Sequence, residues 1–111
     1  SMAQRVLQRM QTAKKTTIDF NMIIKTVERH YPYSMHDLQS KSRSKDLALV
    51  RQMAMFLMKK LTDKSLRDIG DFLGGRDHST VMHAIEKMEY QIHAEPLFKV
   101  KLQQIEKDIM N

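Results

Sequence analysis

The sequence predicts an all-α fold, a compact domain of about six helices that contains a helix-turn-helix. The 111 residues include only two prolines and three glycines, so long segments run without a helix breaker. Apolar residues recur at helical spacing in one segment after another. The pair Gly74-Gly75 separates two such segments by too few residues for anything but a tight corner.

Two amphipathic helices are expected on either side of this glycine pair. The small and apolar positions of the first follow the i, i+3, i+4, i+7 pattern, and those of the second repeat and extend it: Leu66, Ile69, Gly70 and Leu73, then Val81, Ala84, Ile85, Met88 and Ile92. Gly74 and Gly75 stand where the first helix ends, because glycine enters the left-handed conformation after a helix at little cost. The two helices should therefore meet at a steep angle.

The start of the second helix carries residues suited to contact bases. Asp77 is a good N-cap, because its carboxylate can accept from the backbone amides of the first turn. In helix-turn-helix proteins this end of the second helix meets base edges in the major groove. Aspartate can accept from an exocyclic amine there, and serine can contact a thymine methyl. We therefore expect Asp77, His78 and Ser79 to lie against bases.

The remaining segments predict four further helices. One should begin after Thr17 or Asp19 and stop before Pro32, and a short turn should follow from Ser34 to Leu38. The longest should run from Asp46 to Leu61, and the last should start with Glu95 as N-cap and Pro96 as first residue. Their inward positions are expected to be Phe20, Ile23, Ile24, Val27 and Tyr31; Leu38; Leu47, Val50, Ala54, Leu57, Met58 and Leu61; and Phe98, Leu102, Ile105 and Ile109.

Charge is distributed unevenly along the chain. The formal net charge of +6 divides into +4 for residues 1–16, +4 for 17–64 and −2 for 65–111. Phosphate attraction must therefore come largely from the part before the helix-turn-helix. The segment Gln39–Lys45 alternates cations with small hydroxyl side chains and has no apolar anchor, so it should be an exposed loop. From composition alone it is a solvated charged loop.

Several other functional classes are not expected. The chain has no cysteine, and its histidines lack the spacing of a metal site. The glycines lack the lysine that ends a phosphate-cradling loop, and no nucleophile is coupled to a base. No apolar run approaches a membrane span or a signal peptide. We thus predict neither catalysis nor a cofactor in this chain.

Four segments stand out in this order: Lys41-Ser42-Arg43-Ser44-Lys45, Arg51-Gln52-Met53-Ala54-Met55, Ser65-Leu66-Arg67-Asp68-Ile69-Gly70, and Gly74-Gly75-Arg76-Asp77-His78-Ser79-Thr80-Val81 followed by His83-Ala84. Together they resemble the C-terminal DNA-binding domain of the bacterial replication initiator family DnaA. The resemblance covers residues 17–111 and implies a Trp-repressor-like helical domain. Ser42 stands where that family often has another arginine, and Arg67 where proline or a small residue is common.

The resemblance implies two groups of DNA contacts. The base contacts are Arg43, which enters the minor groove, and Asp77, His78, Ser79 and Met82. The contacts to the DNA backbone are Lys41, Lys45, Arg51, Gln52, Lys59, Ser65, Leu66, Arg76, Thr80 and His83. From the helical pattern alone, Arg51, Gln52 and Lys59 are solvent-facing polar residues, and the Ser65 hydroxyl caps the next helix.

The resemblance also implies partners. The target is A/T-rich origin repeats (DnaA boxes) in double-stranded DNA, bound by a monomer in the bacterial cytoplasm at the nucleoid. Residues 1–16 should connect to an upstream ATPase domain that binds ATP or ADP with Mg²⁺ and drives oligomer assembly, with Ser1-Met2 a remnant of recombinant expression. Residues 3–15 should form either a basic connector helix, which could contact acidic phospholipid, or a frayed tail.

Two alternatives stay open from the residues themselves. One is a helix-turn-helix transcription regulator, which would bind palindromic half-sites as a dimer. The other is a helical protein-interaction module whose basic loop meets an acidic partner.

Overall fold

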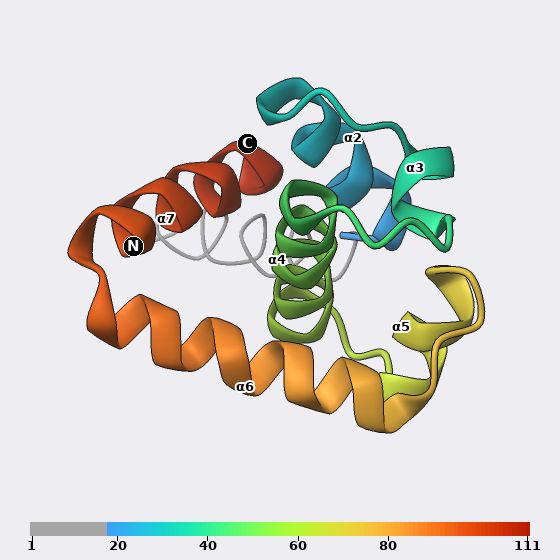
Figure 1. The fold of residues 1–111 in the computed structure, drawn as a ribbon. Helices are drawn as coiled ribbons and strands as arrows, with labels where there is room; N and C mark the ends of the chain where they lie inside the picture. The colour runs from blue at the N-terminus through green and yellow to red at the C-terminus, as the bar shows by residue number, and fades with distance from the viewer. Residues whose placement is uncertain (1–17) are drawn as a thin grey trace.

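The computed structural model describes residues 18–111, and these residues form helices joined by short loops, without any strand (Figure 1). The helices in chain order are α2 (Phe20–His30), α3 (Met35–Gln39), α4 (Lys45–Leu61), α5 (Leu66–Phe72), α6 (His78–Ala94) and α7 (Pro96–Met110). The predicted all-α fold is confirmed. The connector helix and the lipid contact expected for residues 3–15 lie outside the described residues.

Helix α4 is the centre of the fold, with α2, α3, α5 and α6 packed against it and α7 closing the gap between α2 and α6 (Figure 1). The predicted inward stripe of α4 is fully buried, together with Met53 and Met55. Six residues of the predicted stripes are only partly buried against this core: Phe20, Tyr31, Leu66, Ile85, Ile92 and Phe98. Since α4 touches most of the other helices, it fixes their relative positions.

The helices begin at the expected caps. Asp19 accepts from the Met22 amide at 2.9 Å, and Pro96 occupies the first position of α7. Ser34 and Ser65 each form a capping box. The serine hydroxyl accepts from the backbone amide of the aspartate three residues later, and the carboxylate of that aspartate accepts from the backbone amide of the serine. These local signals explain why the helix starts agree with the sequence within a residue.

The corner between α5 and α6 depends on its glycines. Gly74 and Gly75 have φ angles of 85° and 79°, in the left-handed region predicted for them. The Gly70 carbonyl accepts from the amides of Gly75 and Arg76 at 3.0 and 2.8 Å, and a Cβ on Gly70 would overlap the Arg76 carbonyl oxygen. The close approach of the two helices thus requires glycine at position 70, and the predicted helix-turn-helix is present.

The loop between α3 and α4 is shorter than predicted. Gln39 belongs to α3 and Lys45 already belongs to α4, so the non-helical residues are 40–44. We call residues Ser40–Ser44, together with Lys45, the basic loop.

Among the described residues, no helix is long and apolar enough to cross a membrane.

Candidate nucleic-acid interface

The N-terminal tip of α6 projects polar side chains from the helix-turn-helix corner. His78 and Asp77 have exposed side chains, Ser79 is partly exposed, and Met82 is 42% exposed although it lies one turn into the helix. Val81 and Ala84 hold the opposite face in the core. The residues predicted to contact bases therefore share one accessible end of α6.

One detail of this tip differs from the sequence prediction. Asp77 is the N-cap of α6, but its side chain makes no capping hydrogen bond. The carboxylate instead lies 3.1 Å from Nδ1 of His78. The predicted capping bond was wrong because the neighbouring imidazole competes for the carboxylate. Asp77 thus keeps its remaining acceptor positions available to a ligand.

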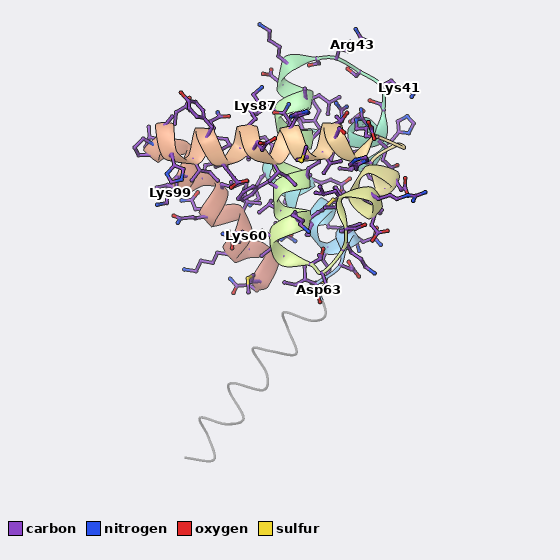
Figure 2. All side chains as sticks on the ribbon, turned by 90° about the horizontal axis from the view of Figure 1, so that it is seen from below. Lys41, Arg43, Lys60, Asp63, Lys87 and Lys99 are labelled. Atoms are coloured by element: carbon purple, nitrogen blue, oxygen red, sulfur yellow. The ribbon has the colours of Figure 1, made fainter. Side chains whose placement is uncertain are left out.

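The basic loop lies beside the helix-turn-helix corner. Lys41, Arg43 and Lys45 are exposed, and Figure 2 shows Lys41 and Arg43 at one edge of the molecule, with Lys60 and Asp63 at the opposite edge. The Gln39 side-chain amide donates to the Phe72 carbonyl at 2.7 Å. The end of α3, where the basic loop begins, therefore lies against the end of α5, where the helix-turn-helix corner begins.

Arg51 is not the solvent-facing residue that the helical pattern indicated. Its side chain is only 6% exposed. Nε donates to the Leu38 carbonyl at 2.7 Å, and Nη2 donates to the Ser40 carbonyl at 3.2 Å. Longer bonds of 3.4 Å reach the carbonyls of Asp37 and Ser42. The prediction was wrong because the chain between α3 and α4 folds back over α4 and needs donors for its carbonyl groups.

Arg76 converges on the same place from the other side. Its Nη2 donates to the Ser40 carbonyl at 2.6 Å, and its Nη1 donates to the Leu73 carbonyl. Burial, and next the positive charge of Arg76, lower the pKa of Arg51, while burial lowers the pKa of Arg76. Within residues 18–111 the ion pairs involve neither arginine. Two guanidinium groups thus meet without a carboxylate between them.

A groove of about 330 Å³ lies between α4 and α6, and both Arg51 and Arg76 are among the residues that line it. Gln52, Thr80 and His83, all predicted to contact the DNA backbone, line it together with Lys87. The Oε1 atom of Gln52 is buried there and has no hydrogen-bond partner among the described residues. Lys87 was not among the predicted contacts, although its spacing of four from His83 and seven from Thr80 places the three on one helix face.

Lys59, Ser65 and Leu66 lie at the other end of α4. Lys59 is exposed in its last turn, fourteen residues after Lys45, which corresponds to about 21 Å along the helix axis. Ser65 caps α5, and Leu66, the first residue of α5, is partly buried. The structure therefore does not bring these three residues to the basic loop, which leads into α4, but places them at or after the far end of α4.

An exposed helix tip at a tight two-helix corner, flanked by a cationic loop, defines a helix-turn-helix DNA-binding domain. Among the described residues, no three His, Asp or Glu side chains gather as metal ligands. Residues 20–88 match the family described as bacterial DnaA protein helix-turn-helix. Because this match spans more than half of the chain, the chain belongs to that family. It is a non-catalytic domain that binds DNA in replication initiation.

Proposed function

We propose that this domain recognises A/T-rich origin repeats in double-stranded DNA, as a monomer at the nucleoid. The tip of α6 enters the major groove, where Asp77, His78, Ser79 and Met82 contact base edges, and Arg43 enters the adjacent minor groove. The observation that carries this proposal is the position of the basic loop beside the start of α6, where Arg76, next to the N-cap Asp77, donates to the Ser40 carbonyl of the loop. Two groove contacts from one chain define an asymmetric site without a second copy.

The backbone contacts follow the edges of this surface. Lys41 and Lys45 flank Arg43, while Gln52, Thr80 and His83 line the groove between α4 and α6. Lys59, Ser65 and Leu66 lie across from them at the end of α4. One domain could therefore contact phosphates at two separate places along the duplex. Arg51 and Arg76 are the exceptions among the predicted backbone contacts, because their guanidinium groups are already hydrogen-bonded within the protein.

Two further properties are proposed from the family resemblance. ATP or ADP with Mg²⁺ would bind an upstream ATPase domain, which would also drive assembly into oligomers. Residues 3–15 would contact acidic phospholipid. Neither property requires a site within residues 18–111.

Titration of the chain with a labelled duplex tests the proposal. One duplex carries an origin repeat, and a second has the same bases in scrambled order. At a fixed salt concentration we expect the repeat to bind at least about 10³ times more tightly. Sedimentation of the complex should give one protein per repeat. Equal affinity for both duplexes would contradict origin recognition, and a two-to-one complex on a palindrome would favour a dimeric transcription regulator instead.

A further inference from the structure

The side chains of Arg51 and Arg76 hold the base of the basic loop. Both donate to the Ser40 carbonyl oxygen, Arg51 from α4 and Arg76 from the residue before the α6 N-cap. Arg51 also reaches the carbonyls of Leu38 and Ser42. All these acceptors are main-chain oxygens at or next to the basic loop. The guanidinium groups of Arg51 and Arg76 therefore hold the main chain of the loop in position.

We propose that Arg76 is a positioning residue, which sets the basic loop in register with the tip of α6 so that Arg43 and Asp77 meet the same duplex. It acts through Arg43 and does not itself contact phosphate. This inference rests on the proposed function, because the minor-groove contact of Arg43 is the property it serves.

The chemistry of arginine explains the choice of residue. The Arg76 guanidinium spans two carbonyl groups, that of Leu73 at the end of α5 and that of Ser40 in the loop. A planar group with diverging N–H donors makes both bonds at once, whereas a lysine ammonium is a compact point charge on a flexible stem. A lysine can still contact phosphate as a point charge, but it cannot make both carbonyl bonds in the geometry of the guanidinium group.

The position of Arg76 supports a role inside the protein. It is partly buried, and a Cβ on Gly74 would come within 3.0 Å of its Nη1 atom. Its donors are directed at the corner and at the loop, between the two elements that approach DNA. Arg76 precedes the α6 N-cap, Asp77, in the chain and is hydrogen-bonded to Ser40, so it links the start of α6 directly to the basic loop.

The first test needs no DNA. Trypsin cleaves after lysine and arginine, and the basic loop contains Lys41, Arg43 and Lys45. In Arg76→Lys we expect cleavage in this loop to become at least about fivefold faster under native conditions, since a released loop opens more often. Cleavage after Lys107 in α7 is the internal reference, and Arg29→Lys, an exposed arginine on α2, is the matched control. Unchanged loop cleavage in Arg76→Lys would overturn the proposal.

The second test is a double-mutant cycle on repeat DNA. Arg76→Lys should weaken binding about tenfold in the native background, and much less in an Arg43→Ala background, because residues that act through one another are not additive. In a background where Lys41, Arg43 and Lys45 are all alanine, Arg76→Gln should leave the slope of log K against log salt unchanged, whereas loss of a phosphate contact made by Arg76 itself would reduce it by about 0.9. Additive effects, or a reduced slope, would show a phosphate contact and contradict the proposal.

The minor-groove contact of Arg43 and the positioning role of Arg76 can fail separately. If Arg43→Ala alone leaves the preference for the repeat unchanged, the minor-groove contact in the proposed function is wrong. Faster trypsin cleavage in Arg76→Lys would still show that Arg76 holds the loop. Thermal unfolding of each variant is measured first, and cleavage is compared at a temperature where all variants are folded.

Discussion

The side-chain amide of Gln39 donates a hydrogen bond to the main-chain carbonyl of Phe72 across 2.7 Å, although the two residues are 33 positions apart in the sequence. Gln39 ends α3, next to the basic loop, and Phe72 ends α5, next to the glycine corner. The two ends are so close that a Cβ on Gly74 would overlap the Gln39 carbonyl oxygen. The junction between loop and corner therefore has no room for a side chain at position 74.

Alanine substitutions at the two glycines of the corner should differ in cost. Both positions have positive φ, so each substitution carries backbone strain of about 1–2 kcal/mol. Gly74→Ala must also displace Gln39, whereas a Cβ on Gly75 meets nothing within 4 Å. We expect Gly74→Ala to lower the free energy of unfolding by about 1–3 kcal/mol more than Gly75→Ala does. Urea denaturation measures both, and equal losses would contradict the packing at this junction.

Asp77→Ala should change base preference without changing stability. Its carboxylate makes no capping hydrogen bond, so the free energy of unfolding should move by less than about 0.5 kcal/mol. Discrimination at the contacted base pair should fall by about 1–3 kcal/mol. Ser65→Ala is the matched comparison, because Ser65 does cap its helix, and its loss should cost about 0.5–2 kcal/mol of stability. Intact specificity in Asp77→Ala would remove the base contact assigned to this residue.

Lys87→Ala should weaken binding to all DNA sequences alike. Lys87 lines the groove between α4 and α6 with His83, where a cation neutralises phosphate without touching base edges. The slope of log K against log salt should fall in magnitude by about 0.9, with the preference for the repeat unchanged. Lys99→Ala is the control, because Lys99 lies on α7, away from the edge that carries Lys41 and Arg43 (Figure 2). A native salt slope in Lys87→Ala would show that the lysine faces solvent in the complex.

Ser65→Ala should raise the pKa of Asp68. Hydrogen bonds from Ser65, first from its backbone amide and then from its hydroxyl, hold that pKa below the ordinary 3.8. Removing the hydroxyl leaves the amide bond, so the pKa should rise part of the way, as carboxyl resonances in an NMR titration would report. Asp37, in the equivalent box with Ser34, should keep its native pKa. An unmoved Asp68 pKa would mean that the hydroxyl contributes nothing to this cap.

The same shift has a defined sign for stability. Because the pKa of Asp68 is lower in the folded chain than the ordinary value of 3.8, its contribution is fully present above that pH. It is lost as the pH falls from 3.8 through the lowered pKa. Urea midpoints measured across this acidic window should therefore drop less steeply in Ser65→Ala than in the native chain.

Much of the fold could be predicted from local sequence. The stripes of apolar residues, the serine caps and Pro96 act within one or two helical turns, so the boundaries of α2, α5 and α7 agree with their predictions. The burial of Arg51 could not be predicted in this way. Its helix pattern is that of a surface residue, and its partners are carbonyl groups of a loop whose path depends on the whole fold.

The candidate site shows the same division. The order of motifs was sufficient to identify the family. The spacing of Thr80, His83 and Lys87 already indicated that Lys87 shares a helix face with the other two. The orientation of the Asp77 carboxylate depended instead on the imidazole of His78, 3.1 Å away. Side-chain choices between competing partners follow from three-dimensional proximity, which residue type and spacing do not specify.

Every acceptor that anchors the basic loop to the arginines is a carbonyl oxygen, a group that all twenty amino acids possess. Exchanging Lys41, Ser42 or Arg43 therefore leaves the attachment intact while altering what the loop presents to DNA. Under the proposed function, the residues that hold the basic loop are therefore different from the side chains that would recognise DNA, so replacing those side chains offers a route to new target preferences on an unchanged frame.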